Sequence, residues 1–438
     1  MAQRKLVIIS IDSMGYKDLA DLSNLAPNLT KLRDQGSWVK RIEGVSPTLT
    51  YPSHTTIVTG QYPAVHGIIN NTKLQPKRES SDWLWYHRYI KVLTLYDLAH
   101  QKGLTTAALL WPVTGSSKID YNLAEIFSNR PWSNQVLVSL KSSSPKFIYE
   151  MNKKYGHMLH GIKQPWRDDF ITACAVDTLE NKKPDLMLLH LVDLDSMRHR
   201  YGVNSAEAKA AWQRQDKRIG QIINATKKAG TFADTNFVIV GDHYQIDVNK
   251  MIHLNMIFEK EGWLESIPGK PTYKNNWTVT AKNCDGEAYI YTCGKVDLKK
   301  VKESFAQVEG IEAIYDQKEA IAKGADPNCS FLVAAKPGYY FTDEVNRPAI
   351  VEEVDPTTLD EPNRYKGMHG FDPNEPNYFT SAIFFGPDIN SGVTVEKSKM
   401  VNEAPTLARL LNVKFPEPIA GKEIREVLKK IKRMDNRE

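Results

Sequence analysis

Cysteine is scarce in this 438-residue chain, and long apolar runs are absent. Four cysteines with no C-x-x-C spacing exclude a disulfide scaffold and a thiolate metal motif. We expect buried free thiols, because a pairing of Cys284 with Cys293 across a predicted hairpin would need an oxidising compartment. No stretch approaches the roughly 20 apolar residues of a membrane span. The chain is therefore expected to make no membrane contact.

The first apolar run, residues 6–11, is also too short for the core of a signal peptide. We therefore expect a cytoplasmic protein. A chain from which a leader had been removed would carry the same signals.

Neither sign of charge dominates, since 57 Lys and Arg face 52 Asp and Glu. The dense basic runs are short, so a small anionic molecule is a better expected partner than a nucleic-acid polymer. One of these runs predicts a terminal amphipathic helix over residues 423–433 with a solvated basic face. An apolar fraction of 41% and a charged fraction of 25% are typical of a globular protein.

Short apolar runs alternate with helical patterns along most of the chain. Three runs end in polar residues, before Asp12, before Asp193 and Asp195, and before Asp242 and His243. The predicted strands are 6–11, 105–110, 186–192, 237–240 and 379–385. The predicted helices include 28–35, 96–102, 169–180 and 205–228. This order predicts an α/β fold with a doubly wound, mostly parallel sheet and helices on both faces, in which such runs are buried parallel strands.

The pattern changes between residues 269 and 343. Alternating residues at 277–280 and 287–291, a helical stretch at 298–308 and a run at 331–335 predict a small α+β unit with hairpins. We therefore predict a core made of residues 1–268 and 344–438. Residues 269–343 form the predicted inserted cap subdomain.

Seven polar side chains are predicted at the carboxyl edge of this sheet or beside it. Each has a structural alternative when taken alone; Asp12 could cap a helix, and His199 or His369 could lie in a surface helix or turn. Together they supply three carboxylates, three imidazoles and one hydroxyl, a set that suits two divalent cations. The residues are Asp12, Thr50, Asp195, His199, Asp242, His243 and His369.

The order of the motifs around these residues is specific. PTLTYPSHTTIVTGQYP at 47–63 and HGIINN at 66–71 are followed by DSMRHRYG at 195–202, GDH at 241–243 and HG at 369–370. This series resembles the type I phosphodiesterase/nucleotide pyrophosphatase family of the alkaline phosphatase superfamily. The resemblance covers the predicted core, whereas the insert and residues 72–90 contain no matching motif.

The resemblance implies a metal-dependent hydrolase with a threonine nucleophile. Thr50 would attack phosphorus and form a covalent phospho-threonine, which water then hydrolyses. One metal ion would be held by Asp12, Thr50, Asp242 and His243. The other would be held by Asp195, His199 and His369. The resemblance implies Zn²⁺, while carboxylate and imidazole ligands also accept Mn²⁺ and other divalent ions.

Substrate residues are also implied by the resemblance. Asn71 matches an amide that donates to a phosphoryl oxygen, and Asn70 replaces it if the alignment slips by one. Tyr51 matches an aromatic position that stacks on a base in nucleotide-cleaving relatives. A cluster of aromatic residues lines the same pocket or packs in the core; its members are Trp83, Trp85, Tyr86 and Tyr89. A small phosphoester, such as a nucleotide, is the expected substrate.

Three further residues are predicted to support the site. Asp193 is expected to position a ligand residue or to cap a helix. His54 is expected to pack behind the nucleophile, and His190 is expected to be a hydrogen-bonded core histidine. The family continues with Gly and often Met after the GDH motif, whereas Tyr244 and Gln245 follow here. This departure leaves the loop shape and substrate fit open.

The leading prediction is hydrolysis of a phosphodiester or pyrophosphate bond. We assign no Arg or Lys to balance the extra charge of a monoester, which favours a diester. A phosphomonoesterase or a phosphonate hydrolase of the phosphonoacetate type would use the same ligands. A catalytically silent binding protein of this fold is a further alternative, and the oligomeric state is left open.

Overall fold

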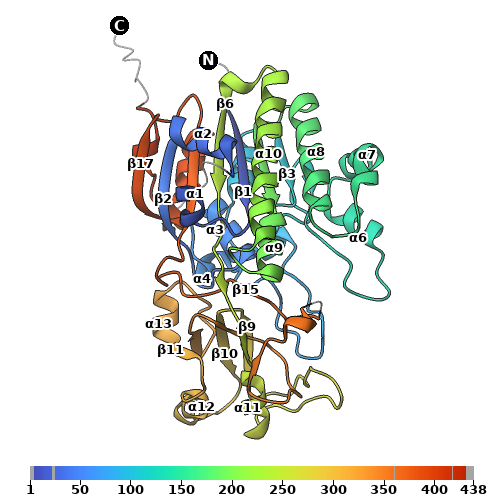
Figure 1. Cartoon of the computed structure of the whole chain (residues 1–438), viewed down its shortest axis with the longest axis vertical. Helices are drawn as coiled ribbons and strands as arrows, with labels where there is room; N and C mark the ends of the chain where they lie inside the picture. Colours follow the sequence, from blue (N-terminus) through green and yellow to red (C-terminus); the bar gives the residue numbers. More distant parts are fainter. Residues whose placement is uncertain (1–3, 22–24, 360, 417, 431–438) are drawn as a thin grey trace.

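The computed structural model describes residues 4–21, 25–359, 361–416 and 418–430. A large α/β unit occupies one end of the molecule, and a smaller unit built around a four-stranded sheet occupies the other (Figure 1). Chain segments on both sides of the smaller unit belong to the large one, so the smaller unit is an insertion.

The large unit contains an eight-stranded sheet with the order β17-β2-β16-β6-β1-β5-β3-β4. The strands are β1 Lys5–Ile11, β2 Ser37–Glu43, β3 Thr106–Leu109, β4 Tyr121–Leu123, β5 Leu186–Leu191, β6 Thr235–Val240, β16 Thr380–Phe385 and β17 Val393–Lys399. Ile8 of β1 is in register with Leu188 of β5 and Val238 of β6, and all three strands are parallel. Their carboxyl ends therefore meet at one edge.

One strand runs against the others. β16 is antiparallel to both β2 and β6, so the prediction of a parallel strand at 379–385 was wrong in direction. Its apolar sequence reflects burial on both faces, which is compatible with either direction.

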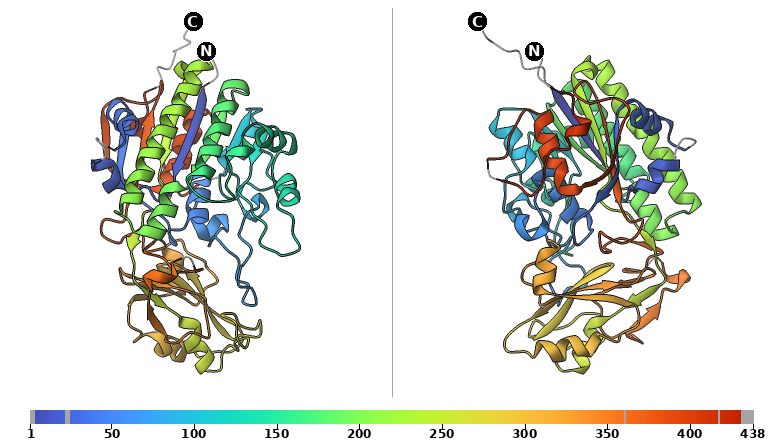
Figure 2. Two further views of the ribbon diagram at one scale, coloured as in Figure 1. Left: turned by 45° about the vertical axis from the view of Figure 1, so that its right-hand side comes forward. Right: turned by 90° about the vertical axis from the view of Figure 1, so that its left-hand side faces the viewer.

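Helices cover both faces of the sheet (Figure 2). Side chains alternate along β1, so Val7 and Ile9 join one apolar cluster while Leu6 and Ile8 join the other. The first cluster includes residues of α2 Pro27–Gln35, α7 Pro145–Tyr155, α8 Trp166–Asn181 and α10 Ala206–Lys228. The second includes residues of α3 Thr50–Thr59, α5 Leu95–Gln101 and α14 Glu403–Leu410. The predicted doubly wound α/β fold is confirmed.

Local signals mark several helix boundaries. The Ser205 side chain accepts a hydrogen bond from Ala208 N–H at the start of α10, and Thr94 and Asp97 form a capping box on α5. The other α-helices of the large unit are α1 Tyr16–Asp21, α4 Pro63–His66, α6 Gln135–Ser142 and α9 Asp193–Tyr201.

The predicted helix at 423–433 is wrong within the described residues, and 431–433 lie outside them. This segment forms only a single 3-10 turn, Arg425–Val427. Val427 is buried and its carbonyl accepts a hydrogen bond from Asn390 N–H, while Lys429 N–H donates to the Asp388 carbonyl. Pairing with the loop after β16 replaces the intrahelical hydrogen bonds.

The inserted unit is an antiparallel sheet with the order β11-β12-β10-β9. Its strands are β9 Val279–Cys284, β10 Glu287–Thr292, β11 Ile311–Asp316 and β12 Phe331–Ala335. The helices around it are α11 Leu254–Lys260, α12 Leu298–Phe305 and α13 Gln317–Ala322. A small sheet lies beside it, made of β13 Tyr339–Phe341, β8 Lys250–Ile252 and β14 Val351–Glu353. The apolar cluster of the inserted unit extends from Ile252 to Val345 and so reaches beyond the predicted bounds of 269–343. The domain boundaries stay a prediction.

All four cysteines are free thiols. Cys174, Cys284 and Cys329 are buried, as expected, whereas Cys293 is exposed at the end of the β9–β10 hairpin. Among the described residues, no helix has both the length and the apolar character needed to cross a bilayer.

Candidate active site

The ends of three parallel strands carry the acidic residues of the motifs. Asp12 directly follows β1, Asp195 lies in the first turn of α9 after β5, and Asp242 and His243 follow β6. The short pairing of β15 Gly367–Met368 with β7 Ile246–Asp247 brings the residue after β15, His369, to the same edge. All seven predicted residues therefore come from elements that meet at this edge.

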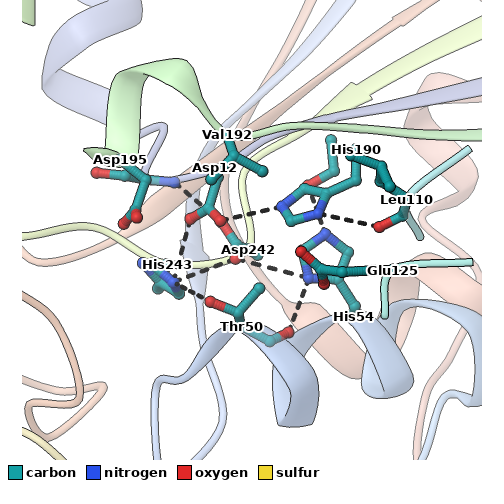
Figure 3. A network of polar contacts seen from close by, with 12 residues as sticks. Asp12, Thr50, His54, Leu110, Glu125, His190, Val192, Asp195, Asp242 and His243 are labelled. Carbon is teal, nitrogen blue, oxygen red and sulfur yellow. Dashed lines mark hydrogen bonds and ion pairs between the residues drawn. The ribbon is translucent and has the colours of Figure 1, made fainter. Parts of the chain in front are cut away.

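Thr50 is the first residue of α3, and its hydroxyl lies among the charged groups (Figure 3). His243 Nε2 lies 3.1 Å from Thr50 Oγ1, 3.3 Å from Asp12 Oδ1 and 3.2 Å from Asp242 Oδ2. The three residues Asp12, Asp242 and His243 present ligand atoms within 4.8 Å of one another. One ring nitrogen thus faces three oxygens, although it carries at most one proton.

A second group consists of Asp195, His199 and His369, whose ligand atoms also lie within 4.8 Å of one another. Asp195 and His199 are four residues apart on α9, which places them on one helix face, with Oδ1 and Nε2 separated by 3.3 Å. The His369 ring centroid lies 5.0 Å from that of His199 and 4.0 Å from that of His243. His369 therefore joins the second group to the first.

Burial makes this concentration of carboxylates costly without a cation. Burial raises the pKa of Asp12 well above its usual range, and the charge of Asp195 adds to the increase. Burial also raises the pKa of Asp242, and Asp12 adds to that increase. Within the described residues, Asp12 Oδ1 and Asp242 Oδ2 are buried and accept no hydrogen bond. These two unsatisfied oxygens fit as ligands of a divalent cation.

The second group is electrostatically different. Burial acts against ionisation of Asp195, but His199, His369 and His243 together lower the Asp195 pKa. Burial likewise acts to lower the His199 pKa, whereas Asp195, with Asp285 and the Gly367 carbonyl, raises that pKa. This carboxylate and imidazole already compensate each other's charge.

The supporting residues lie behind the first group. His190 Nε2 lies 3.0 Å from Asp12 Oδ2, and His54 contacts the Thr50 carbonyl through Nδ1 at 2.7 Å and Ser10 Oγ through Nε2 at 2.9 Å. Both His54 nitrogens therefore have hydrogen-bond partners, although His54, His190 and Asp242 also offer ligand atoms within 4.8 Å of one another. Asp193 points away from the site and accepts hydrogen bonds from Arg214 and Arg218.

Two contacts were missed from the sequence. Gln245 Nε2 donates to Asp195 Oδ1 at 2.5 Å, and Asp285 Oδ2 lies 3.1 Å from His369 Nδ1. In the sequence, Gln245 stands out only because it replaces one of the residues that usually follow the GDH motif in the family. Asp285 lies in the turn between β9 and β10, and no sequence signal connects it to a motif 84 residues away, since only the docking of the insert brings them together.

A cavity of about 710 Å³ is lined by residues of both units. Of the two predicted substrate residues, Asn71 lines it, together with Trp83, His199 and His369, whereas Tyr51 does not. The Tyr51 ring is fully buried and contacts Trp83 edge-to-face at 5.2 Å, so Trp83 presents the aromatic surface to the cavity. A substrate-binding role for Tyr51 stays a prediction.

The adjacent asparagines have different surroundings. Asn71 Oδ1 accepts a hydrogen bond from Tyr51 N–H at 2.9 Å. Asn70 Nδ2 donates to the Asn283 carbonyl and to Cys284 Sγ, and its Oδ1 accepts from Thr72 N–H. Asn70 therefore ties this loop to the insert through Nδ2, while its Oδ1 closes a turn within the loop.

The sequence model of type I phosphodiesterases/nucleotide pyrophosphatases matches residues 6–372. The chain belongs to this family. Human ectonucleotide pyrophosphatase/phosphodiesterase family member 1 is 27% identical over 261 residues, which are 57% of this chain and 24% of that protein. The venom phosphodiesterase of Macrovipera lebetinus is 26% identical over 315 residues, or 67% of this chain and 32% of that protein. The matches thus span about a quarter to a third of these family members.

Solved structures of the family share the fold. Murine ectonucleotide pyrophosphatase/phosphodiesterase 5 superposes with a TM-score of 0.70 at 18% identity, covering 97% of this chain and all of that one. An inactive Thr-to-Ala variant of the murine protein in complex with AMP gives a TM-score of 0.69 at 18% identity. The alkaline phosphatase-like architecture extends over nearly the whole chain.

Proposed function

We propose that this protein is a metal-dependent phosphoesterase that hydrolyses a phosphodiester or pyrophosphate bond through a phospho-Thr50 intermediate. The observation that carries the proposal is the position of the Thr50 hydroxyl, 3.1 Å from His243 Nε2 and beside the carboxylates of Asp12 and Asp242. The named activities of the relatives and the complete set of ligand residues support it.

Two divalent ions, with Zn²⁺ as the first candidate, fit the two groups. One would be held by Asp12, Thr50, Asp242 and His243, and the other by Asp195, His199 and His369. When bound, such ions lower the pKa of a coordinated hydroxyl and neutralise charge on a phosphoryl group. His199 Nδ1 is held by the Gly367 carbonyl at 2.8 Å, which leaves Nε2 for the ion.

The chain's own groups would carry the substitution at phosphorus. The Thr50 oxygen forms the new bond as the ester oxygen of the leaving group departs with a proton, and water then cleaves phospho-Thr50 and restores the hydroxyl. Thr50 lies at the N-terminus of α3, where the helix dipole favours the added negative charge. The amide of Asn71 lines the cavity and would donate to a phosphoryl oxygen.

A nucleotide is the proposed substrate class. The cavity of about 710 Å³ is within the usual range for small-molecule sites, and Trp83 offers an aromatic face beside Asn71. The AMP complex of the murine protein supports the same class.

A Thr50→Ala variant tests the proposal. We expect loss of bis-p-nitrophenyl phosphate hydrolysis with the fold retained, because the nucleophile is removed while Asp12, Asp242 and His243 still offer ligand atoms to the first ion. Thr59→Ala is the matched control, since Thr59 is a buried threonine at the other end of α3 whose hydroxyl donates to the Thr55 carbonyl. Full activity of Thr50→Ala would refute the covalent route.

The bond type needs a separate comparison. Wild-type protein is assayed with bis-p-nitrophenyl phosphate, p-nitrophenyl phosphate and phosphonoacetate at equal concentrations. We expect the highest kcat/KM for the diester. A preference for the monoester would indicate a phosphomonoesterase, and a preference for phosphonoacetate would indicate a phosphonate hydrolase. Inactivity on all three substrates would support a binding role.

A further inference from the structure

Each side chain of the Asp195, His199 and His369 group has a partner on its outer side. Gln245 Nε2 donates to Asp195 Oδ1, and His199 Nδ1 lies against the Gly367 carbonyl. Asp285 Oδ2 lies 3.1 Å from His369 Nδ1. Gln245 and Gly367 flank the motifs of the core, whereas Asp285 belongs to the inserted sheet. The insert therefore touches one ligand residue directly.

We propose that Asp285 is a positioning residue that sets how tightly the Asp195, His199 and His369 group holds its cation. The proposal rests on the proposed function in that it assumes a cation at this group. It assigns the insert a role in metal retention, in addition to forming a wall of the cavity.

The geometry of the hairpin tip supports this role. Gly286 N–H donates to the His369 carbonyl at 3.0 Å, and Phe341 N–H donates to the Asp285 carbonyl at 2.7 Å. A Cβ atom on Gly370 would lie 1.9 Å from the Cys284 carbonyl oxygen, so the loop of His369 packs directly on the hairpin backbone. Asp285 itself has φ +64°, which turns the chain at this contact. The carboxylate is thus held against the ring by backbone on both sides.

The chemistry of a histidine ligand makes the contact consequential. A carboxylate beside Nδ1 favours the tautomer with the proton on Nδ1, and this leaves the Nε2 lone pair for a cation. His369 is buried, with 5% of its surface exposed, so water offers little competition for the Nδ1 proton. The present contact has the distance of an ion pair without the angle of a hydrogen bond. A protonated Nδ1 would give the carboxylate a donor.

The alternative role for Asp285 is contact with the substrate, because its side chain is 22% exposed and lines the cavity. A residue that binds substrate would change KM without changing the metal affinity. A positioning residue would change the metal affinity first. The two roles therefore give separable results.

The test compares Asp285→Asn with Asp343→Asn. Asp343 is the matched control, because it is an acid of the insert that also lines the cavity but contacts Lys282 Nζ and Asn283 N–H, each at 2.6 Å. Both variants and wild type are stripped with a chelator, and Zn²⁺ is titrated back in competition with a chromophoric chelator. Bound ions are counted by elemental analysis, and circular dichroism verifies the fold.

For Asp285→Asn we expect one of two sites to weaken by roughly 10- to 100-fold, with the other unchanged. Activity at limiting Zn²⁺ should fall and return at excess Zn²⁺ with KM unchanged. Asp343→Asn should retain both affinities. If Asp285→Asn is misfolded, Asp285→Glu, which keeps the carboxylate, should restore both the fold and the affinity.

Three outcomes would overturn the proposal. Two wild-type affinities in Asp285→Asn, with or without an altered KM, would exclude the positioning role and leave the proposed function intact. Equal losses in Asp285→Asn and Asp343→Asn would indicate a general distortion of the hairpin. A wild-type protein that binds no divalent ion would defeat the proposed function as well.

Discussion

At the scale of single residues, Asn70 and Asn71 show how neighbours in one motif acquire different tasks. Asn71 uses its Oδ1 to accept from Tyr51 N–H and lines the cavity, so its Nδ2 is the group available to a phosphoryl oxygen. Asn70 is 5% exposed and connects the loop to β9 of the insert. Sequence spacing alone cannot separate them.

Alanine substitution at the two positions should therefore have opposite signatures. Asn71→Ala is expected to lower kcat by about 10²- to 10³-fold, the usual effect of losing one donor to a developing charge. Asn70→Ala should lower the melting temperature, because it leaves the Asn283 carbonyl unpaired, and should reduce kcat less. Steady-state kinetics and thermal unfolding check both. A greater kcat loss in Asn70→Ala would show that the amide was assigned to the wrong residue.

Glu287 provides a pH-dependent prediction away from the ligand residues. Burial raises its pKa to about 8, Asp372 adds to the increase, and Ser46 Oγ donates to the carboxyl at 2.7 Å. The unfolded chain loses this proton near pH 4.5, whereas the folded chain keeps it until about pH 8. The free energy of unfolding should thus fall with rising pH in this window, by up to about 1.4 kcal/mol per pH unit from this group.

A Glu287→Gln variant should remove that contribution, because the amide does not titrate. Urea unfolding at pH 5 and pH 8 measures the difference between the two pH values in the variant and in wild type. Glu312→Gln, at an exposed glutamate of β11 in the same sheet, is the control. An unchanged pH difference in Glu287→Gln would contradict the assignment.

At the scale of elements, a buried ion network joins α8, α9 and α10. Arg218 of α10 is 2% exposed and donates to Asp193 at 2.8 Å and to Asp169 at 2.7 Å. Asp193 also accepts from Arg214. Since Asp193 begins the helix that carries Asp195 and His199, this network fixes the start of α9 against α8 and α10.

Arg218→Leu should therefore destabilise the protein by roughly 3–5 kcal/mol, because Asp193 would remain buried with part of its compensation removed. Chemical unfolding measures the loss. Lys217→Leu, an exposed neighbour on the same helix, should have little effect. A small loss in Arg218→Leu would mean that water or Arg214 replaces the missing charge.

At the scale of the whole molecule, the candidate site lies where the core and the insert face each other (Figure 1). The proposed cations would complete it. Three buried carboxylates and three imidazoles converge there without enough hydrogen-bond donors among the described residues. Bound ions should thus stabilise the fold, by about 2.7 kcal/mol at a concentration 100 times their dissociation constant.

Removal of metal is expected to lower the melting temperature, and added Zn²⁺ should restore it. Differential scanning fluorimetry of stripped and reloaded protein measures the shift. His369→Ala should reduce the shift, because it removes one ligand from the second group. A melting temperature independent of metal would argue that the two groups do not hold ions.

Local chemistry alone was enough to predict most elements of the core. The runs before Asp12 and Asp242 are strands because β-branched and apolar residues fill positions buried on both faces, and Ser205 caps α10 as expected. The apolar pattern does not determine the direction of a strand, since β16 is as apolar as the parallel strands but pairs with β6 in the antiparallel direction. The apolar residues near the C-terminus pack on the core instead of forming a helix, because tertiary contacts outweigh a weak helical pattern.

The sequence by itself determined the family, the α/β core and the residue types available at the sheet edge, because these depend on motif order and on the carboxyl ends of parallel strands. Only the tertiary structure decided which atoms approach one another. It separated Asn71 from Asn70, buried Tyr51 beneath Trp83 and placed Asp285 behind His369. These contacts join segments far apart in the chain, and their distances follow from how the insert packs on the core.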